Sequence, residues 1–324
     1  SGHKPRGANK GHIEVKHLND SYEELQETLQ AAVLDEHALK AQAKAQKRKH
    51  KEESAAQKKA AKAGADSEED SQKKRLYVLN FDGDIKASAT DSLREEITAV
   101  LSLARPTDEV LVRLESAGGM VHSYGLASSQ LARIGKRDIP LTVCVDKVAA
   151  SGGYMMACVA NKILAAPFAV IGSIGVIAQL PNFHKVLKKN DIDFEMITAG
   201  EYKRTLTMFG ENTDKDREKF AEDIEDTHEL FKNFVSEQRP VVNIAEVATG
   251  ETWFGRRALD VQLVDELQTS DEYITAQLDT ADVYEVSYQH KKSLPERLGM
   301  AAEESTDRLL LRWWQRAQGA RWFC

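Results

Sequence analysis

The chain has 324 residues, a formal net charge of −7 and three cysteines. This length suits one large domain or two small ones, and the negative charge is typical of a soluble body. Cys144, Cys158 and Cys324 have neither CxxC nor zinc-ligand spacing. The composition therefore predicts neither a disulfide framework nor a metal site.

The first 74 residues have the composition of a tether. The opening "SGHKPRG" lacks an initiator methionine and resembles a cloning scar or the start of a trimmed chain. From Ala38 to Lys74 the sequence consists almost entirely of Ala, Lys, Gln and Glu, which favours helix but offers little to bury. We expect a charged linker here, and no nucleic-acid binding, because no aromatic residue interleaves the lysines.

From Arg75 onward, predicted strands alternate with predicted helices. The strands are expected at 75–81, 109–115, 140–146, 162–167, 174–179 and 194–199. The helices are expected at 92–104, 122–134, 182–189, 214–239 and 256–267, the last running into a short strand. Ser92 and Glu95 stand in capping-box relation at the start of the first of these helices. The alternation predicts βαβ units, a largely parallel sheet and an α/β fold.

One apolar run, "LAAPFAVIGSIGVIAQL" from Leu164 to Leu180, carries no charged residue. It is at the short limit for a helix that spans a membrane, and it contains Pro167, two glycines and many β-branched residues. These features favour two buried strands joined by a turn rather than a helix that spans a membrane.

Ser151 stands in the stretch "VAASGGYMMACVA", between a predicted strand and the next helix. As a helix N-cap it would satisfy backbone amides with its side chain. As a nucleophile at a strand-to-helix turn it would point its hydroxyl into a cleft, with the Gly152 amide available to stabilise an oxyanion.

Other residues have the properties that a serine nucleophile requires. Gly118 and Gly119 follow a strand, where they form either a plain tight turn or a second oxyanion donor. Lys203 can act as general base if burial disfavours its charged form, and the Ser173 hydroxyl could hold the neutral amine. His184 is the alternative base.

The order of these motifs resembles the signal peptide peptidase A (S49) family of serine proteases. The likeness covers about residues 75–318 and is carried by "SLREEITAVL", "VDKVAASGGYMMACVA", "GSIGV", "YKRTLT", "GENT" and "RLLLRWWQR". It implies a ClpP/crotonase-type α/β fold with repeated ββα units. It also implies a peptidase domain at 75–290, after the 1–74 linker and before an amphipathic tail at 291–324.

By position, the resemblance implies a Ser/Lys dyad without a cofactor. Ser151 would be the nucleophile, Lys203 the general base and Ser173 the hydroxyl that orients it. Gly152 and the Gly118/Gly119 pair would provide the oxyanion amides. The sequence departs from the family at Ala117, where a proline is usual, and this change loosens the turn without removing an N–H donor.

The resemblance also implies the biological setting. The substrates would be membrane-associated peptides such as signal-peptide remnants, and the protein would assemble as a ring or dome of identical subunits in which neighbours can complete each site. An N-terminal anchor upstream of this chain would hold it at the bacterial inner membrane, with the peptidase domain on the periplasmic side. The tail "RLLLRWWQRAQ" is a candidate subunit contact or lipid-binding helix. Two rival functions are a crotonase-type acyl-CoA enzyme and an inactive membrane scaffold.

Overall fold

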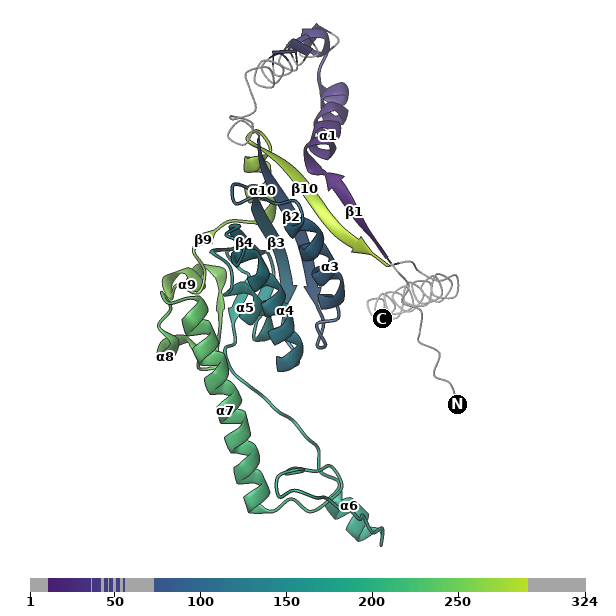
Figure 1. Cartoon of the computed structure of the whole chain (residues 1–324), viewed down its shortest axis with the longest axis vertical. Coiled ribbons are helices and arrows are strands. Elements are labelled where there is room, and N and C mark those ends of the chain that lie inside the picture. The colour runs from purple at the N-terminus through teal and green to yellow at the C-terminus, as the bar shows by residue number, and fades with distance from the viewer. Residues whose placement is uncertain are drawn as a thin grey trace, which may run out of the picture. The chain divides into compact units, whose positions relative to one another are not determined.

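The computed structural model describes residues 11–35 and 73–290, with short helical stretches between residues 37 and 55 (Figure 1). Residues 15–287 form one compact unit, which contains every candidate site residue. The strands are β1 (His12–His17), β2 (Lys74–Gly83), β3 (Glu109–Ser116), β4 (Leu141–Val145), β5 (Val148–Ala150), β6 (Lys162–Ala165), β7 (Val170–Gly172), β8 (Thr252–Phe254), β9 (Glu266–Leu267) and β10 (Ala281–Gln289). The helices are α1 (Leu18–Val33), α3 (Thr90–Leu101), α4 (Val121–Gly135), α5 (Gly152–Ala157), α6 (His184–Lys189), α7 (Asp214–Gln238), α8 (Ile244–Val247), α9 (Gly255–Asp260) and α10 (Ser270–Gln277).

The main sheet has the strand order β1-β10-β2-β3-β4-β6-β9, and its strands from β10 to β9 pair in parallel. A parallel sheet needs cover on both faces, which explains why strands such as β4 are buried along their whole length. Helices α3 and α4 lie side by side across β2 and β3 (Figure 1). The predicted α/β fold is confirmed.

A second, smaller set of strands branches from this sheet. β5 pairs with the end of β3 through Ala149 and Ser116, then with β7 in parallel, and β7 pairs with β8 in antiparallel. The chain therefore runs β4, β5, α5 and then β6, β7, which is the ββα order expected from the family resemblance. This branch brings the start of α5 to the end of β3.

The folded body begins before Arg75, the predicted start. Leu18, at the start of α1, is 7% exposed and packs in a core cluster with Leu76, Leu111 and Val283. The sequence of 18–33 lacks the long apolar run of a core element, so its contribution to the core is a single leucine with Tyr22 packed beside it. Most of the predicted linker, and the whole tail at 291–324, lie outside the described residues.

The segment between β7 and α7 differs from the prediction. Residues 174–179 and 194–199 form no strand, and only α6 matches the predicted helix in this segment. The composition of these two stretches favours strand locally, but none of the strands in the described part of the chain pairs with them. The pair of strands expected in the apolar run is present as β6 and β7. None of the described helices is long and apolar enough to cross a membrane.

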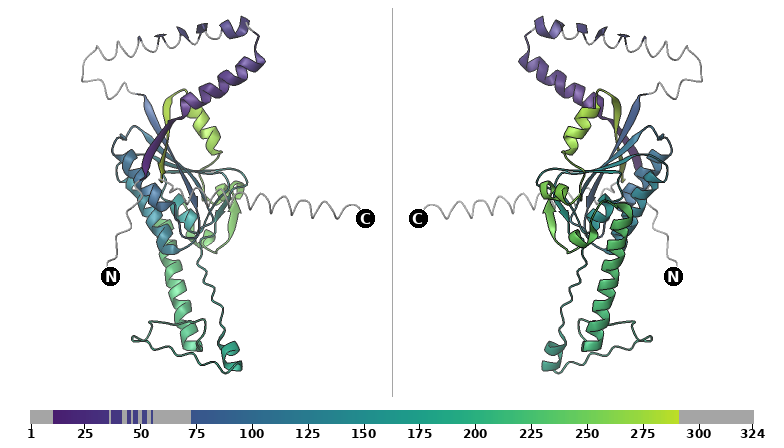
Figure 2. Two further views of the ribbon diagram at one scale, coloured as in Figure 1. Left: turned by 90° about the vertical axis from the view of Figure 1, so that its right-hand side faces the viewer. Right: turned by 90° about the vertical axis from the view of Figure 1, so that its left-hand side faces the viewer.

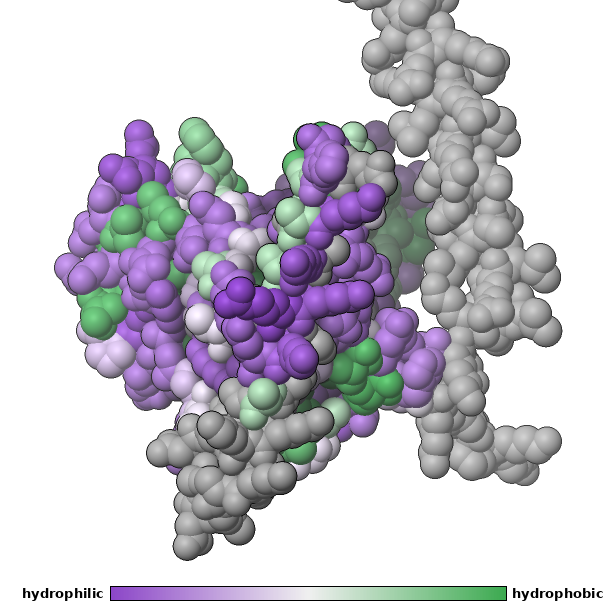
Figure 3. Space-filling model, turned by 90° about the horizontal axis from the view of Figure 1, so that it is seen from above, coloured by the Kyte–Doolittle hydropathy of each residue, from purple (hydrophilic) through white to green (hydrophobic). Residues whose placement is uncertain are grey.

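The capping prediction for the first helix is wrong. Helix α3 begins at Thr90, after an N-cap at Ala89 that makes no side-chain capping bond, so Ser92 lies inside the first turn. Capping boxes occur instead at Thr213 before α7 and at Thr269 before α10. Polar residues cover most of the described surface on the face shown in Figure 3, with separate small apolar groups between them.

Candidate active site

Ser151 lies between the end of β5 and the start of α5, with φ 51° and ψ −120°. A positive φ is rare for a residue with a side chain and costs roughly 1–3 kcal/mol, so the surrounding structure must hold it in place. Ser151 occupies the N-cap position of α5, but its side chain makes no capping hydrogen bond. Its hydroxyl is therefore not used in the way that the N-cap interpretation requires.

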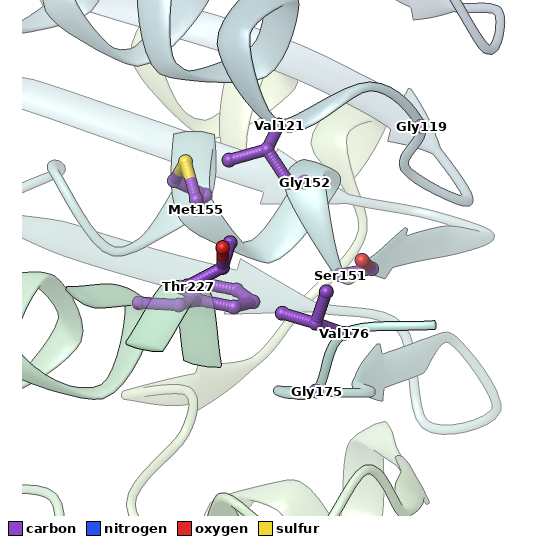
Figure 4. A pocket seen from close by; sticks show the side chains of 9 residues that line it. Gly119, Val121, Ser151, Gly152, Met155, Gly175, Val176 and Thr227 are labelled. Atoms are coloured by element: carbon purple, nitrogen blue, oxygen red, sulfur yellow. The ribbon is translucent and has the colours of Figure 1, made fainter. Parts of the chain in front are cut away.

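The Ser151 side chain lines a small, partly open pocket (Figure 4). Apart from the Ser151 hydroxyl, the side chains around it are mainly apolar, with Val121, Met155 and Val176 visible close by. The pocket is lined by Gly119, Val121, Ser151, Gly152, Met155, Gly175, Val176, Thr227 and Phe231. Four parts of the chain thus meet here: the turn before α4, the start of α5, the segment after β7 and the middle of α7.

The predicted glycine pair forms one wall of the site. Gly118 has φ 90°, and a Cβ there would lie 2.7 Å from the Gly152 amide nitrogen, so only glycine allows this approach. The Gly118 amide donates to Ser116 Oγ (3.0 Å), and the Met120 amide donates to the Ile85 carbonyl (2.9 Å). Gly119 lines the pocket and Gly118 does not.

Two backbone amides beside Ser151 remain available. Among the described residues, neither the Gly152 amide nor the Gly119 amide donates a hydrogen bond. Gly152 is also the first residue of α5, where the helix N-terminus favours negative charge.

The segment after β7 forms the opposite wall. Ser173 has φ 51°, its amide donates to the Glu251 carbonyl (2.7 Å), and it does not line the pocket. His228 on α7 lies with Nε2 3.2 Å from the Ile174 carbonyl oxygen. Both contacts hold the backbone that continues into Gly175 and Val176 at the pocket.

The structure does not bring Lys203 to Ser151 within one subunit. Lys203 is exposed and does not line the pocket. The ring of its neighbour Tyr202 lies 5.4 Å from Lys219 Nζ, near the start of α7. The pocket residue Thr227 is eight positions after Lys219 on α7. At the rise of an α-helix, Lys219 and Thr227 are therefore roughly 12 Å apart along the helix axis.

The alternative base, His184, is not at the pocket either. It is the first residue of α6, which lies near the far end of α7 from α5 (Figures 1 and 2). No histidine lines the pocket in the part of the chain that the structure describes.

Several residues at the site were not singled out from the sequence. Ser116 and Tyr124 flank the glycine pair in the stretch "ESAGGMVHSYG", but their positions alone gave no sign of a shared hydrogen bond. Thr227 and Phe231 come from α7, where Phe231 belongs to the buried face of a long amphipathic helix. The apolar periodicity of that helix predicts burial but not burial against a serine.

Comparison with known proteins decides the family. The family model "Peptidase family S49" matches residues 133–284, and "Peptidase family S49 N-terminal" matches residues 2–131. "Probable protease SohB" of Haemophilus influenzae is 53% identical over 303 residues, which is 94% of this chain and 86% of that protein. The chain belongs to peptidase family S49. It is therefore a serine-type peptidase, and the family predicted from its motifs is confirmed.

Other SohB proteins share the same likeness. "Probable protease SohB" of Buchnera aphidicola subsp. Schlechtendalia chinensis is 63% identical over 199 residues, covering 61% of this chain and 65% of that one. Within the family, the quoted phrases had predicted a likeness to SohB, which these relatives confirm. A solved structure of a mutant "1510-N membrane-bound stomatin-specific protease" in complex with a substrate peptide aligns at TM-score 0.43 and 14% identity, covering 70% of this chain and 96% of that one. Membership of an S49 peptidase family favours neither the acyl-CoA enzyme nor the inactive scaffold.

Proposed function

We propose that this S49 peptidase is a serine endopeptidase in which Ser151 is the nucleophile. The observation that carries the proposal is the backbone of Ser151, held at φ 51° beside two unused amides at the mouth of an apolar pocket. Strained backbone of this kind is concentrated at functional sites, where the fold maintains it for a purpose. The Gly152 amide and the glycine pair at 118–119 would hold the oxyanion.

In the proposed reaction, Lys203 is the general base. Its neutral amine takes the proton of Ser151 Oγ as that oxygen bonds to the peptide carbonyl carbon, and the carbonyl electrons move onto the oxygen. The resulting ammonium protonates the leaving nitrogen as the C–N bond breaks. The neutral amine then deprotonates a water that attacks the acyl ester, and the released serine oxygen regains the proton.

Lys203 would come from a neighbouring subunit. The separation of Lys203 from the pocket within one subunit supports a homo-oligomer in which the segment between β7 and α7 reaches the next Ser151. Ser173 would then orient the incoming amine. That segment also exposes many large apolar side chains, as expected of a surface covered in an assembly. They are Ile177, Leu180, Phe183, Val186, Ile192, Phe194, Met196, Ile197, Tyr202, Met208 and Phe209.

The proposed substrates are membrane-associated peptides, such as signal-peptide remnants, with small or apolar residues at the cleavage site. The pocket supports this choice because Val121, Met155, Val176 and Phe231 give it apolar walls, and none of the described residues that line it is charged. An upstream anchor would hold the protein at the inner membrane with the peptidase domain in the periplasm.

Single substitutions test the residues of the dyad. Labelling by a fluorophosphonate and cleavage of an apolar peptide should both disappear in Ser151→Ala. Lys203→Ala should abolish cleavage. Lys215 is an exposed lysine nearby that pairs with Glu201, and Lys215→Ala should cleave normally. His184→Ala should also remain active. Full activity of Lys203→Ala together with loss in His184→Ala would assign the base to His184 instead.

A mixing experiment tests the shared site. Ser151→Ala and Lys203→Ala, each inactive alone, should regain about a quarter of wild-type activity when co-expressed in equal amounts, because about one interface in four then joins an intact serine to an intact lysine. An oligomer that forms but stays inactive after mixing would mean that each site takes both residues from one subunit.

A further inference from the structure

We infer that Ser116 and Tyr124 are positioning residues that hold the glycine turn against Ser151, and that Gly119 rather than Gly118 supplies the second oxyanion amide. This inference rests on the proposed function of Ser151 as nucleophile. It assigns a role to two buried side chains that do not line the pocket themselves.

A chain of hydrogen bonds connects the turn to the end of β2. The Gly118 amide donates to Ser116 Oγ (3.0 Å), which lies 2.6 Å from the Tyr124 hydroxyl. The Tyr124 hydroxyl donates to the Asp84 carbonyl (2.7 Å). Since the phenol donates its one proton to Asp84, the 2.6 Å bond uses the proton of Ser116, whose Oγ also lies 3.4 Å from the Gly83 carbonyl oxygen, a longer contact. Every short bond in the chain then runs in one direction. Ser116 is 2% exposed and Tyr124 is fully buried, so water does not compete for these bonds.

The chain decides which glycine can serve as an oxyanion donor. The Gly118 amide is already used by Ser116, whereas Gly119 lines the pocket with its amide unused among the described residues. On its other side, the Met120 amide is fixed to the Ile85 carbonyl (2.9 Å). The Gly119 amide thus lies between two anchored neighbours, which is the preorganisation that oxyanion stabilisation requires.

The ring of Tyr124 has a second contact at the site. A Cβ at Gly152 would lie 2.4–2.8 Å from ring and Cβ atoms of Tyr124, so the tyrosine packs directly on the backbone of the other oxyanion residue. One side chain therefore touches Gly152 with its ring and holds the 118–119 turn with its hydroxyl. Replacement by phenylalanine removes only the second of these two contacts.

The chain offers matched controls for both positions. Tyr154 is also a fully buried tyrosine, and its hydroxyl donates to the Leu263 carbonyl (2.8 Å) away from the glycine turn. Ser128 is 1% exposed and donates to the Tyr124 carbonyl (2.8 Å) within α4. Tyr124→Phe is therefore compared with Tyr154→Phe, and Ser116→Ala with Ser128→Ala. Each variant loses one buried hydroxyl, so a general loss of stability should affect both members of a pair.

The test measures kcat, KM and the affinity for a peptide aldehyde, which forms a tetrahedral adduct. Tyr124→Phe and Ser116→Ala should lower kcat by about 10- to 100-fold and weaken aldehyde binding in proportion, with KM little changed. Binding of the uncleaved peptide should be equal in Ser151→Ala and in Ser151→Ala with Tyr124→Phe. The controls should keep kcat within about threefold of the wild type.

Two results would overturn the inference. Values of kcat for Tyr124→Phe and Ser116→Ala that match those of their controls would show that the hydroxyls do not position the turn, while Ser151 labelling would leave the nucleophile assignment intact. Cleavage that persists in Ser151→Ala would instead refute the proposed nucleophile, and the positioning role with it.

Discussion

The backbone amide of Ser151 donates a hydrogen bond to the carbonyl oxygen of Gly172, at 2.8 Å. This bond extends the pairing of β5 with β7, whose last partners are Ala150 and Gly172. Ser173 follows Gly172 as Ser151 follows Ala150, and both serines have φ 51°. Two neighbouring parallel strands therefore end in left-handed backbone, and the sheet, not only the helix after it, fixes the conformation of Ser151.

Ser151→Gly should be more stable than Ser151→Ala by about 1 kcal/mol. Glycine adopts a positive φ without steric cost, and the gain is partly offset by the greater freedom of glycine in the unfolded chain. Urea denaturation of the two variants measures the difference, and neither variant should cleave peptide. Equal free energies of unfolding would mean that the fold holds Ser151 without strain.

Gly118→Ala should lower both stability and activity, whereas Gly125→Ala should not. At Gly118 the new Cβ meets the backbone of Gly152 at 2.7 Å and the residue keeps a positive φ, a combination we expect to cost about 2–4 kcal/mol. At Gly125, inside α4, a Cβ meets nothing within 4 Å, so alanine should stabilise the helix by about 0.5–1 kcal/mol. Thermal unfolding and peptide cleavage check both variants, and a stable, active Gly118→Ala would contradict the close approach.

The sequence predicts those parts of the fold in which local pattern and tertiary context agree. The strand at 109–115 and the helix at 214–239 are found within one or two residues, because periodicity, flanking residues and burial all favour the same element. Residues 194–199 have strand-forming composition, but among the residues that the structure describes they have no partner strand. An apolar segment that lies exposed on the subunit surface looks, in the sequence, like a buried strand.

The candidate site also contains residues that the sequence singles out and contacts that it does not predict. Residue types and their order are enough to single out Ser151, because few arrangements place Ser-Gly-Gly between a strand and a helix. The link between Asp84 and Tyr124 was not predictable, since 40 residues separate the two partners and neither belongs to a chemical motif. The separation of Lys203 from the Ser151 pocket was not predictable either, because the order of motifs along a sequence does not fix the distances between them in the fold.

Asp108→Asn should destabilise the protein most at neutral pH. Burial alone would raise the pKa of the Asp108 carboxyl, but hydrogen bonds from Arg105 and Arg75 lower it below the usual value. A lowered folded pKa stabilises the fold above the unfolded value of about 4, and this contribution is lost as pH falls through the folded pKa. The substitution should cost about 3 kcal/mol near pH 7, because it leaves two arginines without their carboxylate, and less below pH 4.

The control for this prediction is Asp91→Asn. Asp91 is 81% exposed and lies 3.7 Å from Arg94 on the surface of α3, where such pairs contribute at most about 1 kcal/mol. Urea denaturation between pH 3 and pH 7 should show a pH-dependent difference from the wild type for Asp108→Asn and almost none for Asp91→Asn. A constant difference at position 108 would indicate loss of packing rather than loss of charge.

Cys144 and Cys158 should be unreactive in the folded protein. Burial raises the pKa of Cys144 to about 12 and raises that of Cys158 as well, so neither thiol forms the reactive thiolate at pH 8. In a Cys324→Ser background, a thiol-specific disulfide reagent should label no cysteine in the native protein and two after unfolding in urea. Rapid native labelling of either residue would show that its side chain reaches solvent.

The same shift predicts how stability changes at alkaline pH. Because the folded pKa of Cys144 lies above the unfolded value, the unfolded chain releases its proton first, and the free energy of unfolding should fall as pH rises above about 9. The slope from this one thiol approaches about 1.4 kcal/mol per pH unit and ends near pH 12. Cys144→Ala removes this titration, so its stability should decline less steeply than that of the wild type between pH 9 and pH 11. Parallel curves for the two proteins would mean that burial does not hold the thiol protonated. A smaller slope in the variant would assign the alkaline loss of stability to Cys144, whose strand lies between β3 and β6.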